Sequence, residues 1–153
     1  MRQTPTAYFE RSLIMSCMTN PVREDECVFI IYKGEAPVNE MMSTRYVANK
    51  YLAAKHWNRI VVDITEWRSR PTFLELSSLA SNLSSELPSN TRVALVVRSN
   101  QVEQAKIIER VARNEGVSVA YFFEAREAKN WVQGRKPLEL ENNGIIHKIK
   151  TSQ

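Results

Sequence analysis

The segment Arg59-Ile60-Val61-Val62-Asp63 is a short apolar run, typical of a strand that is buried on both faces of a sheet. Two similar runs follow, Val93-Ala94-Leu95-Val96-Val97 and Val117-Ser118-Val119-Ala120-Tyr121-Phe122-Phe123. Each run leads into a stretch in which apolar residues recur at helical spacing. Strands that alternate with helices pair in parallel through right-handed crossovers. The sequence therefore predicts parallel strands with helices packed on the sheet.

The helices that follow these runs have recognisable signals. Thr72-Phe73-Leu74-Glu75 matches a capping box, and Asn100-Gln101-Val102-Glu103 is a second capping signal. Pro88, Gly116 and Gly134 predict the three helix ends. The residues predicted to face inward are Phe73, Leu76, Ala80, Leu83 and Leu87, then Val102, Ala105, Ile108 and Ala112, and finally Ala125, Ala128, Trp131 and Val132.

The first part of the chain predicts an antiparallel hairpin of residues 8–17 and 27–33, with turn residues from Thr19-Asn20-Pro21 to Glu26 between them. A helix is expected from Val38 to about His56, although Arg45 interrupts its apolar stripe. The fold class is thus α/β, with a mixed sheet of about five strands. We expect a single domain over residues 1–133. Residues 134–153 are expected to be a tail that is partly disordered or supplies one edge strand at Ile145-Ile146.

Composition narrows the class of protein. With 153 residues and 43% hydrophobic residues, the chain can bury one substantial core. The net charge of +4 is dispersed without a block of like charges, which favours a solvated surface and no nucleic-acid partner. The apolar run Leu13-Ile14-Met15 is too short for a signal peptide, and no stretch is long enough to span a bilayer. We therefore expect a cytoplasmic protein.

Two cysteines, Cys17 and Cys27, are too few for a disulfide framework and lack the paired spacing of a zinc site. One interpretation is that both are reduced and partly buried. The other is that they face each other across the predicted hairpin and form a redox-sensitive bridge. Both interpretations stay open at this point.

Four strings carry a resemblance to a known family. They are Tyr32-Lys33-Gly34-Glu35-Ala36-Pro37, Ile60-Val61-Val62-Asp63-Ile64, Arg92-Val93-Ala94-Leu95-Val96-Val97 and the closing segment from Phe122 to Val132. Together with the order of elements, they resemble the STAS superfamily, specifically its SpoIIAA-like branch of small bacterial proteins. In that branch a strand ending in Phe leads into a helix carrying an Ala and then a Trp followed by an aliphatic residue. Phe122, Ala128, Trp131 and Val132 keep that spacing.

The resemblance implies a regulatory module. STAS proteins that oppose anti-sigma factors carry a phosphorylatable Ser in an Asp-Ser-Ser-Gly-like turn. The corresponding stretch here, from Asp63 to Thr72, lacks the Gly and the Ser pair. Thr72 stands where the modified hydroxyl would be, so it is a candidate for phosphorylation. Its alternative role is structural, as a helix cap.

Catalytic patterns are missing from the sequence. No Gly-rich phosphate loop, metal-ligand cluster or nucleophile with a matching base is visible, so we expect no enzyme activity, no cofactor and no metal. His56 and His147 are the only histidines, and His56 lies near a predicted helix end, where it suits the helix dipole.

The loop from Thr65 to Pro71 is the candidate binding site, because open α/β sheets bind ligands at the carboxyl ends of their strands. It contains Trp67, Arg68 and Arg70, and Trp and Arg are enriched at binding hot spots. The alternative is that Trp67 covers the end of the sheet while the arginines are solvated.

The sequence thus predicts a non-enzymatic, STAS-like module that binds a protein partner, or a second copy of itself in a homodimer. The predicted contact residues are Asp63, Trp67, Arg68, Arg70 and Thr72. An alternative function is that of a carrier of a small hydrophobic or lipid-like ligand in a cavity beneath a helix, as in lipid-carrier relatives of the superfamily. The methionines that would line such a pliable pocket are Met15, Met18, Met41 and Met42.

Overall fold

Within the described part of the chain, five strands form one mixed sheet in which every strand pairs with the next one in sequence. The structure is a computed structural model and describes residues 17–134. The strands are β1 (Cys17–Val22), β2 (Cys27–Gly34), β3 (Arg59–Trp67), β4 (Arg92–Val96) and β5 (Ser118–Phe122). β1 and β2 are antiparallel, and the other three pairs are parallel. The predicted α/β class, with a hairpin followed by parallel strands, is confirmed.

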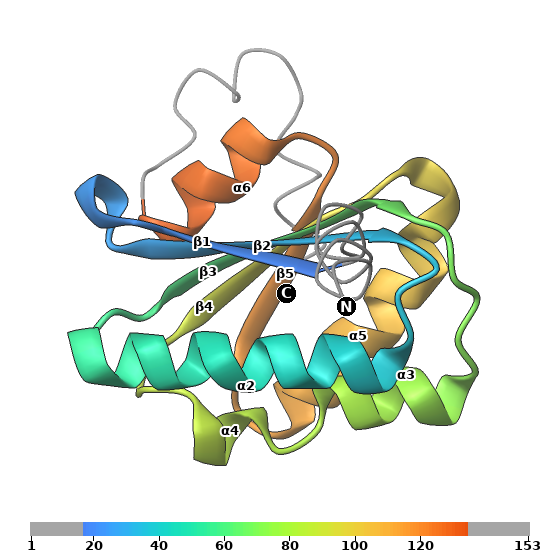
Figure 1. The fold of residues 1–153 in the computed structure, drawn as a ribbon, viewed down its shortest axis with the longest axis horizontal. Helices are drawn as coiled ribbons and strands as arrows, with labels where there is room; N and C mark the ends of the chain where they lie inside the picture. Colours follow the sequence, from blue (N-terminus) through green and yellow to red (C-terminus); the bar gives the residue numbers. More distant parts are fainter. Residues whose placement is uncertain (1–16, 135–153) are drawn as a thin grey trace, which may run out of the picture.

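Helices cover both faces of the sheet, but unequally. The helices are α2 (Val38–Lys55), α3 (Phe73–Ala80), α4 (Leu83–Glu86), α5 (Val102–Asn114) and α6 (Ala125–Val132), with 3₁₀ turns η1 (Arg23–Asp25) and η2 (Ser99–Gln101). Figure 1 shows α2, α3, α4 and α5 on one side of the sheet and α6 on the other. The crossovers β2–α2–β3, β3–α3–α4–β4 and β4–α5–β5 therefore all pass over the same face.

The central strands are buried on both faces, which explains their continuous apolar sequences. In β3, Ile60, Val62 and Ile64 join the larger core beneath α2 to α5, whereas Val61 joins the smaller core beneath α6. Successive side chains of a strand point to opposite faces, so a strand between two helix layers needs apolar residues at consecutive positions. The pattern at residues 60–64 is thus a direct consequence of the two-sided packing.

The N-terminal hairpin exists, but its first strand is displaced from the predicted position. β1 runs through Thr19-Asn20-Pro21, which we expected to form the turn, and the reversal comes at η1, with Glu26 in the left-handed region (φ 49°). Among the described strands β1 is an edge strand, the position in a sheet where proline is tolerated, as at Pro21. The predicted strand residues 8–16 lie outside the described part of the chain.

The proposed bridge between the two cysteines is wrong. Cys17 pairs with Tyr32 and Cys27 pairs with Val22, so the cysteines are at opposite ends of the hairpin. They also face opposite sides of the sheet, Cys17 in the larger core and Cys27 in the smaller one. Both are free and buried. The interpretation as separate buried thiols is the one that the structure supports.

The predicted helix from Thr72 to Pro88 is two shorter helices. Its start is confirmed, because Thr72 Oγ1 accepts from Glu75 N at 3.1 Å and Glu75 Oε1 accepts from Thr72 N at 2.8 Å. The break follows α3, where Asn82 takes the left-handed conformation (φ 62°) before α4. Phe73, predicted to face inward, is 58% exposed. The apolar spacing across the break reads as continuous because both helices pack on the same face of the sheet.

The later helices lie close to the predicted positions. α5 buries Ala105, Ile108 and Ala112 as expected and is followed by Gly116 with φ 84°. Its start differs, since Asn100 does not cap the helix and Gln101 Oε1 instead accepts from Arg98 N at 2.9 Å. In α6 the predicted inward residue Ala125 is exposed, whereas Ala128 and Val132 are buried.

Three further expectations concern the ends of the chain and its environment. Ile145-Ile146, His147 and Met15 lie outside the described residues, as does nearly all of the predicted tail. Within residues 17–134, no helix combines the length and apolar character needed to cross a membrane. The same segment contains no group of three or more His, Cys, Asp or Glu residues placed to hold a metal ion.

Candidate functional site

Trp67 is a buried core residue at the end of β3, so of the two interpretations the structure supports the one in which Trp67 covers the end of the sheet. Its side chain is 1% exposed, and its Nε1 donates to Ala36 O at 3.0 Å. The cause is a bulge, because β3 advances from Asp63 to Glu66 while β2 advances only from Ile31 to Lys33. The extra residue reverses the alternation of side chains, which turns Trp67 into the larger core. The indole covers the end of the sheet and offers no surface to a partner.

Asp63 also uses its side chain locally. The carboxylate Oδ1 accepts from Thr65 N at 2.8 Å and from Thr65 Oγ1 at 2.6 Å. Asp63 is half-buried in β3, two positions after Val61 and on the same face of the sheet, which α6 covers. These bonds stabilise the backbone next to the bulge. A role of Asp63 in partner binding stays a prediction.

Arg68 and Arg70 line a pocket that the sequence did not reveal. They follow β3 directly and lie beside residues that follow β4, around a pocket with a volume of about 200 Å³. We call it the basic pocket. It is lined by Trp67, Arg68, Ser69, Arg70, Arg98, Asn100, Gln101 and Gln104. The basic pocket therefore lies at the carboxyl ends of two neighbouring parallel strands, where open α/β sheets bind their ligands.

Gln101 holds the two sides of the basic pocket together. Its side chain is only 3% exposed, and its Nε2 donates to Ile64 O at 2.7 Å and to Trp67 O at 3.1 Å. Arg98 adds a second connection, since its Nη1 donates to Thr65 O while its Nε donates to Asn100 Oδ1 at 3.2 Å. Side chains of the β4–α5 connection thus bond to the backbone of β3. The wall of the pocket is fixed by the fold.

The charge in the basic pocket is one-sided. Three of its lining residues are arginines and none is an aspartate or glutamate. Glu103, in the first turn of α5, is exposed but does not line the pocket. Within the described part of the chain, none of the three arginines forms an ion pair. Neighbouring positive charges without a counter-ion favour binding of an anion.

Two exposed apolar side chains follow the pocket residue Arg70 closely in sequence. Phe73 and Leu74, at the start of α3, are 58% and 75% exposed. Thr72 just before them is exposed too, and its hydroxyl is engaged in the capping box. Of the five predicted contact residues, Trp67, Arg68 and Arg70 line the basic pocket, although the indole of Trp67 is buried, and Thr72 lies close by in sequence. The sequence patterns did not indicate the lining residues Arg98, Asn100 and Gln104. These residues follow β4 in the same way that Arg68 follows β3, and this shared position after a buried strand is the signal that would have indicated them.

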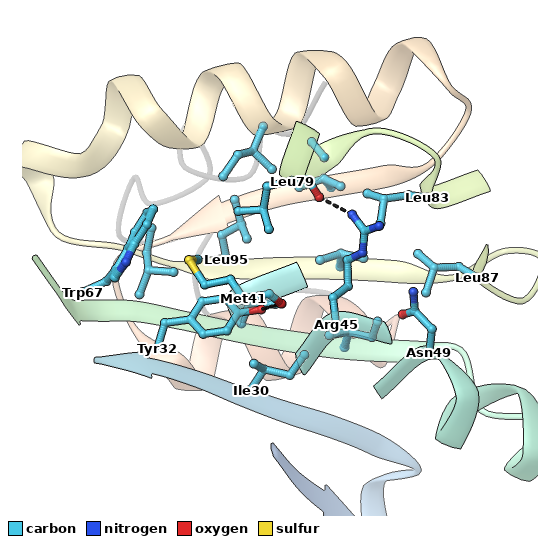
Figure 2. Close-up of a pocket in the computed structure, with 17 residues that line it drawn as sticks. Ile30, Tyr32, Met41, Arg45, Asn49, Trp67, Leu79, Leu83, Leu87 and Leu95 are labelled. Carbon is cyan, nitrogen blue, oxygen red and sulfur yellow. Dashed lines mark hydrogen bonds between the residues drawn. The ribbon is translucent and has the colours of Figure 1, made fainter. Parts of the chain in front are cut away.

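A second candidate site is a cavity beneath α2 (Figure 2). Its volume is about 60 Å³, and its walls are apolar side chains of the sheet, α2, α3 and α4, with Met41 and Leu83 among them. Its polar lining residues are Tyr32 of β2 and Arg45 and Asn49 of α2. Of the methionines predicted to line a pocket, Met41 does so; Met18 is 46% exposed and Met42 is half-buried.

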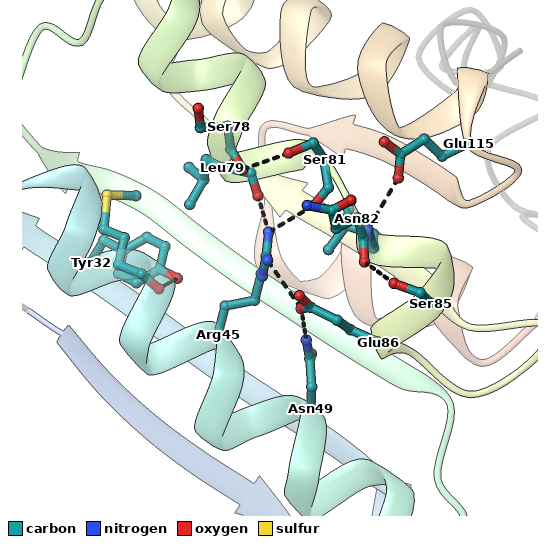
Figure 3. Close-up of polar contacts among 12 residues, drawn as sticks. Tyr32, Arg45, Asn49, Ser78, Leu79, Ser81, Asn82, Ser85, Glu86 and Glu115 are labelled. Atoms are coloured by element: carbon teal, nitrogen blue, oxygen red, sulfur yellow. Dashed lines mark hydrogen bonds and ion pairs between the residues drawn. The ribbon is translucent and has the colours of Figure 1, made fainter.

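The polar residues of that cavity belong to a cluster that joins α2 to α3 and α4 (Figure 3). Arg45 Nη1 donates to Leu79 O, and Arg45 Nη2 pairs with Glu86 Oε1 at 3.0 Å. Asn49 Nδ2 donates to the same oxygen of Glu86 at 2.9 Å. Arg45 Nε and Asn49 Oδ1 are buried and have no hydrogen-bond partner among the described residues. Arg45 interrupts the apolar stripe of α2 because it reaches the carbonyl groups at the end of α3.

His56 is the residue that follows α2, in the left-handed conformation (φ 62°) and exposed to solvent. It lies outside both candidate sites. Comparison of the chain with family models, curated proteins and solved structures finds no match.

Proposed function

We propose that this chain is a non-enzymatic regulatory module that binds a protein partner through the edge formed by the basic pocket and the exposed residues Phe73 and Leu74. The observation that carries the proposal is the combination of three arginines without a lining carboxylate and an exposed apolar pair next to them. Arg and aromatic side chains contribute much of the binding energy in protein interfaces. The resemblance to the STAS superfamily supports a role of this kind.

The chemistry of the basic pocket is that of binding. Its guanidinium, hydroxyl and amide groups supply hydrogen-bond donors for an acidic group of a partner. A partner with an acidic group and an apolar side chain next to it fits this edge. In this proposal the module works in the cytoplasm of a bacterial cell, and a second copy of the chain is one candidate partner.

The proposal is tested by comparing two double variants as bait in affinity capture. Arg68→Glu/Arg70→Glu reverses both charges in the basic pocket. Arg23→Glu/Arg110→Glu reverses two exposed charges, on η1 and on α5, that do not line it. We expect a protein captured by the native chain to be lost from the first variant and retained by the second. A partner retained equally by both variants would contradict the proposal.

The homodimer is measured separately, by sedimentation of the native chain over a range of concentrations. If the basic pocket is the interface, the Arg68→Glu/Arg70→Glu chain stays monomeric where the native chain dimerises. Dimers that form equally in both chains would place the interface elsewhere.

A second candidate function is the carrier of a small hydrophobic ligand, because the cavity beneath α2 has an apolar lining. Its volume of about 60 Å³ is well below the ~150 Å³ of a cavity that holds benzene. Carriage of a lipid-like molecule therefore requires α2 to separate from α3 and α4. Native mass spectrometry after mild purification tests this, since a retained ligand mass supports a carrier and an empty chain opposes it.

A further inference from the structure

We propose that the basic pocket binds a phosphate monoester group, and that the group belongs to a phosphorylated side chain of the partner protein. This inference rests on the proposed function, because it identifies the chemistry that the partner presents to the edge around Arg68 and Arg70. It assigns the anion that would neutralise three arginines, none of which forms an ion pair within residues 17–134.

The donor groups of the basic pocket suit a phosphate. Arg68 and Arg70 supply planar guanidinium groups, which bind two oxygens of a phosphate at once. Arg98 adds positive charge, while its Nη1 and Nε bond to Thr65 O and Asn100 Oδ1. Ser69, Asn100 and Gln104 add hydroxyl and amide groups to the lining. A phosphate monoester carries up to two negative charges and three acceptor oxygens, so it can engage several of these donors together. The pocket volume of about 200 Å³ is more than a phosphate group requires.

The frame of the basic pocket is preorganised. Gln101 and Arg98 bond to backbone oxygens of Ile64, Thr65 and Trp67, so the walls keep their separation without a ligand. Arg68 and Arg70 are exposed, and their guanidinium groups keep donors for an incoming anion. A fixed frame lowers the entropy lost on binding.

The exposed start of α3 favours a peptide as the source of the phosphate. Phe73 lies three residues after Arg70, so their Cα atoms are at most about 11 Å apart. A phosphorylated side chain in the pocket would therefore bring its neighbouring residues within reach of Phe73 and Leu74. A free small phosphate would leave both apolar side chains in water.

The first experiment titrates the ¹⁵N-labelled full chain with inorganic phosphate at constant ionic strength, balanced with sodium chloride. We expect saturable amide shifts concentrated at residues 68–70 and 98–104. Binding should strengthen as the pH rises through the range in which inorganic phosphate gains its second negative charge. Shifts spread evenly over all basic residues, or none that saturate, would overturn the proposal.

Matched variants assign the binding to the basic pocket. Arg68→Gln/Arg70→Gln should weaken phosphate binding by about tenfold or more, because it removes two charge-assisted donors. Arg23→Gln/Arg110→Gln removes the same charge from outside the pocket and should change the affinity by less than about twofold. If both variants lose phosphate affinity equally, the effect is one of overall charge, and the assignment of phosphate binding to the basic pocket is overturned.

The source of the phosphate is tested with three probes: a peptide with one phosphoserine between two leucines, the same peptide without phosphate, and a short single-stranded DNA. We expect the phosphopeptide to bind more tightly than inorganic phosphate, and Phe73→Ala to weaken the phosphopeptide alone. If the phosphopeptide binds no more tightly than inorganic phosphate, the proposal that the phosphate group belongs to a protein is overturned. DNA that displaces the phosphopeptide at equal concentration would overturn it in favour of a nucleic-acid backbone.

Phosphatase treatment of the extract separates this inference from the proposed function. If the captured partner is lost after treatment, the phosphate inference is supported. A partner still captured after treatment, and still lost from Arg68→Glu/Arg70→Glu, would overturn the phosphate inference and leave the protein-binding function standing.

Discussion

Arg45 of α2 and Glu86 of α4 form an ion pair, with 3.0 Å between Arg45 Nη2 and Glu86 Oε1. The same guanidinium donates to Leu79 O, a carbonyl at the end of α3. Carbonyls in the last turn of a helix have no partner within the helix. Arg45 therefore supplies donors to the break between α3 and α4, and it links that break to α2 (Figure 3).

Replacing Arg45 should destabilise the fold although it is a charged residue on a helix. Its side chain is 12% exposed, so Arg45→Ala removes the donor to Leu79 O and leaves Glu86 with Asn49 as its one remaining donor, which should cost about 2 kcal/mol or more. Glu86→Gln should cost less, because the amide oxygen still accepts from Arg45 and Asn49. Urea unfolding measures both. Arg110→Ala, at an exposed site, is the control and should stay within about 0.5 kcal/mol, so equal values for the two arginines would contradict the assignment.

Trp67→Ala should unfold the protein more easily, since the indole is buried and its N–H is bonded to Ala36 O. The expected loss in free energy of unfolding is about 3–5 kcal/mol. Trp67→Phe keeps most of the volume and should lose less. Thermal and urea unfolding measure the stability of both variants. A Trp67→Ala chain as stable as the native chain would contradict the prediction. Trp67 variants are therefore unsuitable for testing partner binding, whereas Arg68 and Arg70 are exposed.

Stability should fall at alkaline pH. Burial raises the pKa of the Cys27 thiol from 9.0 to about 12, and burial also raises the pKa of Cys17 and of the Tyr32 hydroxyl. Folding thus favours the protonated groups, so their contribution is complete below pH 9 and is lost for Cys27 as the pH rises towards about 12. The free energy of unfolding should depend less steeply on pH in Cys27→Ala. If the free energy of unfolding depends on alkaline pH equally steeply in the native chain and in Cys27→Ala, the prediction is contradicted.

The two thiols should react only when the chain opens. Both are buried, and a raised pKa leaves little thiolate at neutral pH. A chromogenic disulfide reagent should modify them slowly in the native state and rapidly in denaturant. Mild oxidation of the native chain should yield no bond between them, because they occupy opposite ends of the hairpin. A rapid intramolecular disulfide would show that this strand register is wrong.

Thr72 should contribute about 1 kcal/mol through its cap. Thr72→Ala removes the acceptor of the Glu75 N–H, whereas Thr72→Ser keeps it. Phosphorylation of Thr72 would place a second negative group beside the Glu75 carboxylate, which bonds to the Thr72 N–H at 2.8 Å. Urea unfolding of the two variants measures the cap. Equal stability of Thr72→Ala and Thr72→Ser would contradict its contribution.

Local patterns were good predictors of the elements. The aliphatic runs at 59–63, 93–97 and 117–123 became β3, β4 and β5, and the capping box at Thr72 starts α3. The same patterns failed where a local sequence allows two outcomes. Thr19-Asn20-Pro21 has turn chemistry but forms an edge strand through pairing with β2, and the apolar spacing at 73–87 does not reveal the break at Asn82.

The candidate site was predicted only in part. Arg68 and Arg70 were identified because they follow a central strand. Arg98, Asn100 and Gln104 follow β4 as Arg68 follows β3, but only the parallel pairing of β3 with β4 shows that the two connections meet around one pocket. Trp67 was misplaced because a bulge changes the face of every residue after it, and a bulge depends on pairing between strands.

By itself, the sequence determined the order of strands and helices and the parallel pairing of β3, β4 and β5, because hydrophobic period and capping act over a few neighbouring residues. Only the tertiary structure decided that Trp67 points into the core, that Arg45 meets Glu86 and that three arginines surround one pocket. Those relationships join residues some thirty or more positions apart, such as Arg98 and Thr65 at 33 positions. They depend on strand register and helix packing, which a local sequence pattern does not encode.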